Sequence, residues 1–290
     1  MRIDIHTHIF PPEFIDERDR FFPGEPIFKL LYGSPTARLA TAETLLEIMD
    51  RDAVDIAVTF GFPWRNPELA YRHNDYVLEA ASKYSRLVPL GCVNPLGQGS
   101  LQEANRCLRS GAKGLGELAI YDECDKETAL NGFRELVESC RSHGGILLVH
   151  ANEPVGHWYP GKATLGLDFF YALARLTAEM PLILAHWGGG LCFYELLKKD
   201  APEVLKHVYY DTAASPFLYR PDVYRIMART LDAEKLLFGS DFPLLPPRRY
   251  FQDFSEAGLT ADEIRAISGE NAARLFNLTV RPEPCPHPPR

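Results

Sequence analysis

The sequence contains no hydrophobic run of about 18 residues, the length that a helix needs to cross a bilayer. Its first residues, MRIDIHTHIF, lack the apolar segment of a secretory signal peptide, so we expect a cytoplasmic protein without a membrane partner. Positive charge is not in excess, because 31 Lys and Arg against 39 Asp and Glu give a formal net charge of −8. This balance argues against a nucleic-acid-coating surface, and we expect no nucleic-acid partner.

Cysteine pairs are also missing. The six cysteines include no C-x-x-C pair and follow no regular spacing, so they do not predict a disulfide framework. We interpret them as reduced and mostly buried thiols. The composition, 46% hydrophobic and 24% charged, is ordinary for a globular protein.

Short apolar runs alternate with longer helical patterns along the whole chain. Several of the runs are continuously apolar, which suits parallel strands that are buried on both faces. Eight strands alternating with helices predict a single α/β domain, a (β/α)₈ TIM-type barrel, with an open doubly wound sheet as the alternative. The predicted strands are Ile3–His8, Asp55–Phe60, Leu87–Val93, Lys113–Ala119, Gly145–His150, Leu182–His186, Val208–Asp211 and Leu236–Asp241.

We expect the barrel to occupy residues 1–280, with an insertion at about 10–40 after the first strand. The insertion contains five prolines, and a segment of that length between two elements is usually functional, for example as a lid. The proline-rich tail, residues 281–290, is predicted to be disordered.

Polar residues close several of the predicted strands, and in a barrel these ends meet at one mouth. His6 and His8 are two positions apart on one strand, so both side chains point to the same face and can chelate one metal ion. A chance pair of surface histidines is the alternative. The other residues of this kind are Glu117, His150, His186 and Asp241.

Each of these four residues has a structural interpretation beside the metal-binding one. His150 or His186 alone fits a core histidine with a backbone partner, but both at consecutive strand ends are hard to attribute to chance. Asp241 fits a helix N-cap, although Phe242 and Pro243 follow it and no helix starts at once. Glu117 follows two glycines that leave room in the barrel; it either bridges two metals or forms a salt bridge to a neighbouring cation.

The constellation resembles the amidohydrolase superfamily. The segments IDIHTHIF, LILAHWGGG and LLFGSDFP are similar to its amidohydrolase-2 branch, which includes aminocarboxymuconate-semialdehyde decarboxylase-like enzymes, and the resemblance spans residues 1 to about 277. It implies a distorted (β/α)₈ barrel that binds a divalent metal, and we expect zinc.

The resemblance implies one of two metal arrangements. In mononuclear relatives, the positions of His6, His8, His150 and Asp241 bind the ion, and His186 acts as an acid/base or orients the water. In binuclear relatives such as TatD-type enzymes, a glutamate corresponding to Glu117 bridges two ions, and His150 and His186 hold the second ion. The segment GLGEL favours the second arrangement.

The predicted function is metal-dependent hydrolysis of a small amide, lactone or ester. A metal lowers the pKa of its bound water towards about 7, and Asp241 would take the proton and pass it to the leaving group. With one ion, His186 would also stabilise the developing oxyanion. The alternatives are non-oxidative decarboxylation of a small unsaturated or aromatic acid, a TatD-type phosphodiesterase or deoxyribonuclease, and a non-catalytic metal-binding module.

The loops at the mouth supply candidate contacts to a small-molecule substrate. His157 and Lys162 follow the fifth strand and could bind an anionic group, while Trp64 follows the second strand and could pack on an apolar one. An ordinary loop with aromatic residues packed on the rim is the alternative. A homodimer is the commonest assembly for such a protein.

Overall fold

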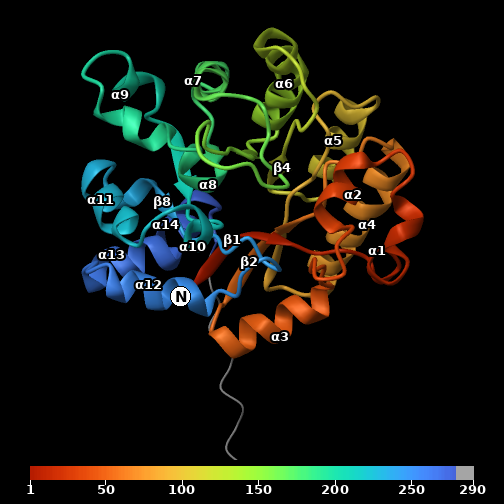
Figure 1. Ribbon diagram of the computed structural model, residues 1–290, viewed down its shortest axis with the longest axis horizontal. Coiled ribbons are helices and arrows are strands. Elements are labelled where there is room, and N and C mark those ends of the chain that lie inside the picture. The colour runs from red at the N-terminus through yellow and green to blue at the C-terminus, as the bar shows by residue number, and fades with distance from the viewer. Residues whose placement is uncertain (279–290) are drawn as a thin grey trace, which may run out of the picture.

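The computed structural model describes residues 1–278, and the predicted tail at 281–290 lies outside the described residues. Parallel strands form the centre of the molecule and helices surround them (Figure 1). The strands are β1 (Ile3–His8), β2 (Ile56–Phe60), β3 (Leu87–Pro89), β4 (Gly114–Leu118), β5 (Ile146–Val149), β6 (Leu182–Leu184), β7 (Val208–Asp211) and β8 (Leu236–Leu237).

The strands follow chain order around the barrel. β1 to β3 form one parallel sheet and β4 to β8 form another. Parallel bridges join the sheets at both seams, Gly91 to Leu115 and Thr7 to Phe242. Backbone hydrogen bonds also cross the seams, for example from His8 N to Phe242 O at 2.8 Å. The predicted (β/α)₈ barrel is confirmed, and a doubly wound sheet does not fit this strand order.

The strands are short and mostly apolar; β1, β2 and β7 end where predicted, and the other five end earlier than predicted. β5 ends at Val149, β6 at Leu184 and β8 at Leu237, so His150 and His186 lie in the connections that follow. Buried residues of the strands, among them Ile5, Phe60 and Leu148, fill the barrel interior below these ends. The polar residues at the strand ends therefore lie directly above this apolar interior, at the carboxyl-terminal mouth of the barrel.

The outer helices begin where the sequence provides caps. Thr41 Oγ1 accepts a hydrogen bond from Thr44 N, and Thr260 forms a capping box with Glu263. The longer helices are α3 (Ala42–Asp52), α4 (Pro67–Lys83), α5 (Ser100–Arg109), α6 (Lys126–Ser142), α7 (Leu167–Leu176), α11 (Asp222–Thr230) and α12 (Arg248–Glu256). The final helical segment runs through α13 (Ala261–Arg265), a π-helical turn (Ala266–Glu270) and α14 (Asn271–Leu275).

The helical pattern of residues 194–199 predicts an α-helix there, and this prediction is wrong. A 3-10 turn, η2 (Leu191–Leu196), precedes a single helical turn, α9 (Ala201–Val204). The helix is interrupted because Leu197 is extended, with φ −67° and ψ 131°, and Asp200 has a positive φ of 64°. The helix α12 was not predicted from the sequence.

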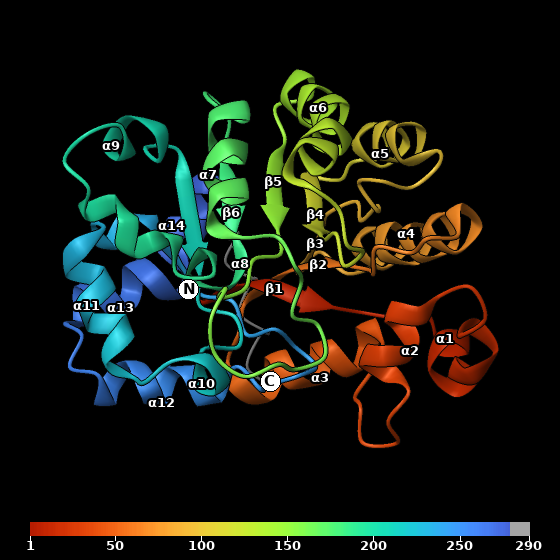
Figure 2. The same cartoon turned by 45° about the horizontal axis from the view of Figure 1, so that its top comes forward.

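The insertion is ordered and packs beside α4. It contains α1 (Pro12–Asp16), a 3-10 turn at Arg18–Phe21, and α2 (Pro26–Tyr32), and Figures 1 and 2 both place α1 and α2 next to α4. Phe10, Phe14 and Phe28 are fully buried in an aromatic cluster that this segment shares with the loop after β2. Burial of these rings holds the end of α2 over the barrel mouth.

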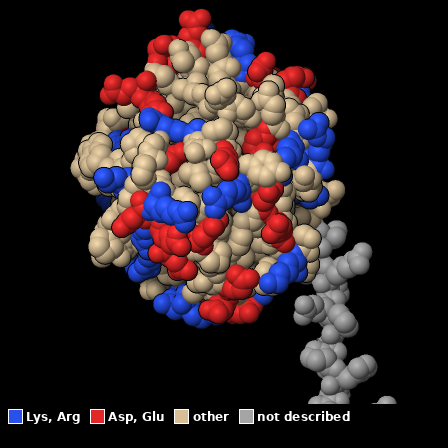
Figure 3. All heavy atoms as spheres, turned by 90° about the vertical axis from the view of Figure 1, so that its right-hand side faces the viewer, with Lys and Arg blue, Asp and Glu red and all other residues tan. Residues whose placement is uncertain are grey.

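The surface agrees with the charge balance of the sequence. On the face seen in Figure 3, Lys and Arg side chains are interspersed with Asp and Glu side chains. Within residues 1–278, none of the helices combines the length and apolarity that a bilayer span requires.

Candidate active site

His6 and His8 lie on the inner face of β1 with their Nε2 atoms turned towards the mouth. His6 Nδ1 lies 2.8 Å from Asp211 Oδ2, and His8 Nδ1 lies 3.1 Å from the carbonyl oxygen of Gly61. Because both partners can only accept, each Nδ1 carries the hydrogen in the neutral ring and each Nε2 presents a lone pair. His6 Nε2 is fully buried and makes no hydrogen bond within the described chain.

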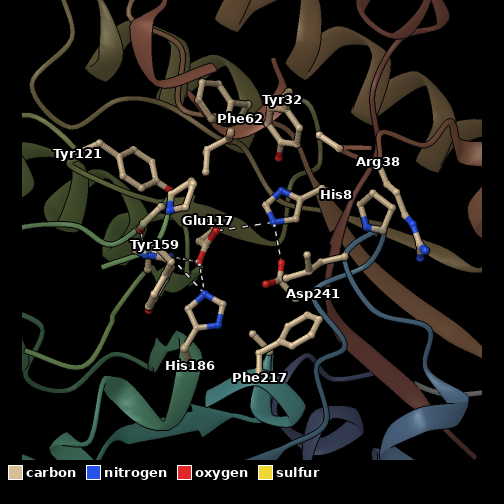
Figure 4. Close-up of a pocket in the computed structure, with 18 of the residues that line it drawn as sticks. His8, Tyr32, Arg38, Phe62, Glu117, Tyr121, Tyr159, His186, Phe217 and Asp241 are labelled. Atoms are coloured by element: carbon tan, nitrogen blue, oxygen red, sulfur yellow. Dashed lines mark hydrogen bonds and ion pairs between the residues drawn. The ribbon is translucent and has the colours of Figure 1, made fainter. Parts of the chain in front are cut away.

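Two carboxylates face these lone pairs. Asp241 Oδ1 lies 3.5 Å from the Nε2 atoms of both His6 and His8, and Glu117 Oε2 lies 3.7 Å from the same two atoms. In Figure 4, dashed lines join the His8 ring to Glu117 and to Asp241. The atoms form one donor group of two imidazole nitrogens and two carboxylate oxygens.

The second oxygen of Glu117 faces a second donor group. Glu117 Oε1 lies 3.0 Å from His150 Nδ1 and 3.1 Å from His186 Nε2, and these nitrogens are 3.2 Å apart. The remaining ring nitrogens point to carbonyls, His150 Nε2 to Gly161 at 3.0 Å and His186 Nδ1 to Ala213 at 3.2 Å. In the neutral rings, two lone pairs therefore converge on the same carboxylate oxygen.

This arrangement fits divalent cations. Imidazole nitrogens and carboxylate oxygens are the ligands of zinc and related ions, and one atom from each of His6, His8 and Asp241 lies within 4.8 Å of the others. His6, Glu117 and His186 satisfy the same criterion. Converging lone pairs repel unless a cation or a proton separates them, and the unbonded His6 Nε2 is such a ligand position.

The site is anionic, and its groups shift each other's pKa values. Burial raises the pKa of Glu117, but His6 and His150 outweigh burial and hold it well below its usual range. Burial also opposes ionisation of Asp241, yet hydrogen bonding to His8 and the charges of His6 and His186 lower its pKa to about 2. Burial disfavours the protonated form of His6, but Glu117 and Asp211 raise its pKa well above the ordinary value. Both carboxylates are therefore ionised at neutral pH.

Backbone strain is concentrated at two of these residues. His186 has φ 109° and Asp241 has φ 62°, in a region that favours glycine. Gly189 (φ 61°) completes the turn after β6, where a Cβ atom would lie 2.3 Å from Asn152 O. Non-glycine residues in such conformations typically occur at functional sites.

A cavity of about 680 Å³ opens above the two donor groups. Its floor includes His8, Glu117, His150, His186 and Asp241. Its walls come from the insertion, the loops after β2, β4 and β5, α10 (Ser215–Leu218) and the loop after β8. Figure 4 shows aromatic side chains around the charged floor, among them Tyr32, Phe62, Tyr121, Tyr159 and Phe217.

The residues predicted to contact substrate have different placements. His157 lines the cavity at its exposed rim. Lys162 is not in the lining, because its ammonium group binds Glu153 Oε1 at 3.0 Å and the carbonyls of Val155 and His157. Trp64 is 1% exposed in the aromatic cluster and donates to His73 Nδ1 at 2.9 Å. A direct substrate contact therefore does not fit Lys162 or Trp64 as the structure places them, since one anchors its own loop and the other anchors the insertion.

Sequence reasoning missed Asp211, which is fully buried behind His6. Its Oδ1 accepts a hydrogen bond from Ala213 N at 3.0 Å, so the carboxylate links the loop after β7 to the His6 ring. A signal was present in the sequence: Asp211 is an acidic residue at the end of a predicted apolar strand, like Asp241.

We expect Asp211→Asn to weaken metal binding by about 10–100-fold, because the carboxylate orients His6 and increases its basicity. Competition with a fluorescent chelator measures this affinity. Asp253→Asn, at a buried aspartate on α12, is the control for loss of a buried charge. An unchanged affinity in Asp211→Asn would show that His6 does not need this partner.

Comparisons with known proteins give a family match and several similar folds. The model of a family described as amidohydrolase matches residues 3–278. No curated protein matches the chain. Among solved structures, 5-carboxyvanillate decarboxylase from Sphingomonas paucimobilis is 18% identical, with a TM-score of 0.72 over 96% of this chain and 99% of that one.

Two further solved structures represent different reactions. A putative 2-pyrone-4,6-dicarboxylic acid hydrolase from Pseudomonas putida is 17% identical, with a TM-score of 0.68 over 97% of this chain and 98% of that one. A dihydroxybenzoic acid decarboxylase from a Polaromonas species, solved with manganese and 2-nitroresorcinol, is 17% identical, with a TM-score of 0.68 over 95% of this chain and 96% of that one. At these identities the likeness shows the shared fold.

Proposed function

Because this chain belongs to the amidohydrolase family, whose members are metal-dependent, we propose that it is a hydrolase that uses two divalent ions to cleave a small amide, lactone or ester. The observation that supports two ions is the position of Glu117. One of its oxygens faces His6 and His8 at 3.7 Å, and the other faces His150 and His186 at 3.0 and 3.1 Å. A carboxylate shared in this way would bridge a pair of cations.

The residues around the cavity floor have distinct roles in this proposal. His6, His8 and Asp241 would hold the first ion, His150 and His186 the second, and Glu117 both. When bound, the ions supply Lewis-acid activation of water and of the scissile bond. Asp241 is ionised and lies on the cavity floor, so its carboxylate can accept the proton of the attacking water and return it to the leaving group.

Decarboxylation of a small aromatic or unsaturated acid is the second candidate. It is favoured by the aromatic wall of the cavity and by similarity to two decarboxylases of the same fold. In that reaction His186 or Asp241 would handle the proton that replaces the carboxyl group. A TatD-type phosphodiesterase is less well supported, because the cavity lining among residues 1–278 contains one arginine and no lysine for a phosphate backbone.

The metal identity, the cytoplasmic location and assembly as a homodimer stay predictions from the sequence. Zinc suits the histidine-rich donor set, but the same atoms accept manganese, the ion found in one neighbour of this fold.

A product screen on protein of measured metal content tests the reaction. Lactones, esters, amides and aromatic acids are incubated with the metal-loaded protein, and products are identified by mass spectrometry. We expect products that have gained the elements of water. Loss of carbon dioxide from an acid would establish the second candidate instead, and no turnover in any class would contradict both.

A further inference from the structure

Within residues 1–278, three tyrosines line the cavity, and the hydroxyl groups of two of them have no hydrogen-bond partner. Tyr159 donates its hydroxyl hydrogen to Glu153 Oε2 at 2.9 Å. The hydroxyls of Tyr32 and Tyr121 form no hydrogen bond with any residue of the described chain, and both rings border the cavity. Figure 4 shows Tyr32 and Tyr121 on the same side of the floor, above His8 and Glu117.

Both of these rings are held in place by packing. The ring centroid of Tyr32 lies 5.3 Å from that of Phe10, 5.1 Å from Phe28 and 6.0 Å from Phe62. Tyr121 stands 5.5 Å from the ring of His150, which belongs to the second donor group. A fixed ring positions its hydroxyl before a ligand arrives, so little conformational entropy is lost on binding.

The hydroxyls are neutral donors beside an anionic floor. A phenol has an ordinary pKa of about 10 and keeps its hydrogen at neutral pH. Burial raises the pKa of both groups further, and the carboxylates of Asp241 and Glu117 add to this effect. Each hydroxyl can therefore donate to an oxygen atom of a ligand.

Lysine and arginine side chains are scarce around the same space. Arg38 is the one Lys or Arg in the cavity lining of residues 1–278, and its side chain is exposed at the rim. In Figure 4 its guanidinium group points away from His8 and Glu117. Lys162, the other cation considered for this role, is bound to Glu153. A carboxylate placed near Tyr32 would meet neutral donors and no lysine or arginine side chain of residues 1–278.

We propose that Tyr32 and Tyr121 are specificity-determining residues that donate hydrogen bonds to an uncharged oxygen of the substrate, a hydroxyl or carbonyl near the reacting group. The site then favours a substrate that carries such an oxygen over one that carries a second carboxylate at the same place. This inference rests on the proposed function for the location of the reacting group. It concerns binding, however, so it is measured independently of turnover.

The test is equilibrium binding of non-cognate probes to the metal-loaded protein by calorimetry, with recovery of each probe checked by chromatography. The probes are benzoate, 3-hydroxybenzoate, 4-hydroxybenzoate and isophthalate. We expect at least one hydroxybenzoate to bind about ten-fold more tightly than benzoate, the effect of one well-placed hydrogen bond. Isophthalate should bind no more tightly than benzoate.

Substitutions then assign the effect to the hydroxyls. Tyr32→Phe or Tyr121→Phe should reduce the preference for the hydroxybenzoate to near unity and leave benzoate binding in place. Tyr159→Phe is the matched control, because its hydroxyl is already donated to Glu153, and the preference should persist.

Three results would overturn the inference: equal binding of benzoate and both hydroxybenzoates, a preference that survives both phenylalanine variants, or tighter binding of isophthalate that Arg38→Ala abolishes. Failure of all four probes to bind would count against it as well. If the product screen finds no turnover but the probes show the expected preference, the proposed function fails and the binding inference stands.

Discussion

Asp241→Asn is expected to reduce kcat by about 10²–10⁴-fold or more, the range of a lost general acid–base group. Asparagine has nearly the volume and shape of aspartate, so the turn at φ 62° and the cavity wall should keep their form. The substitution removes a negative charge that lies 3.5 Å from the Nε2 atoms of His6 and His8, and it removes the base at the cavity floor. Activity falls because the base for proton transfer is lost and because the first ion is bound more weakly.

Metal-loaded Asp241→Asn is assayed beside its circular dichroism spectrum, which should match that of the unaltered protein. Asp222→Asn, at a partly exposed aspartate on α11 that pairs with Arg220, controls for the substitution itself and should keep full activity. His6→Ala should also abolish turnover, since it deletes a first-ion ligand. Full activity in either purified variant with normal metal content would contradict the mechanism.

The sequence predicted the parts of the site that depend on strand order. Parallel strands in a barrel bring their carboxyl ends to one mouth, so His6, His150 and Asp241 could be grouped without knowing any distance. Their polarity against apolar strands such as Ile146–Val149 made them visible. The alternation of apolar and helical patterns, together with the strand order, was enough to predict the barrel and its charged floor.

The roles of residues that depend on side-chain packing could not be predicted from the sequence in the same way. Trp64 and Lys162 have the chemistry of substrate contacts, but neighbours far along the chain or in the same loop engage them, His73 for one and Glu153 for the other. Tyr32 comes from an insertion whose path over the mouth follows from burial of Phe10, Phe14 and Phe28. No periodic pattern of hydrophobic residues predicts the path of this insertion over the mouth.

Asp211 shows a third kind of limit. The sequence pattern predicts that Asp211 lies at a strand end. Its role, however, depends on a 2.8 Å contact with His6, which is far away along the chain. Strand order makes such a contact feasible because β7 and β1 flank β8. Only the structure shows that the carboxylate turns towards the ring rather than into the cavity.

Glu117→Gln is the second substitution with a large expected effect, and it separates the one-ion from the two-ion arrangement. Glutamine keeps the length of the side chain but offers one carbonyl oxygen and an amide nitrogen that cannot bind a cation. The bridge between the two donor groups is lost, and His150 and His186 remain without an anionic ligand. We expect the metal content to fall from two equivalents per chain to one, and kcat to fall by at least about 10²-fold.

Metal content is measured by mass spectrometry of the acid-digested protein after dialysis, and Glu135→Gln at an exposed position of α6 is the control. His6, His8 and Asp241 should still hold one ion in the Glu117 variant, because their mutual contacts do not pass through Glu117. A protein that binds one equivalent before the substitution and one after it would instead have a mononuclear centre, with Glu117 as a substrate contact. Two equivalents retained in Glu117→Gln would show that the second ion is held without the bridge, and the role assigned to Glu117 would be wrong.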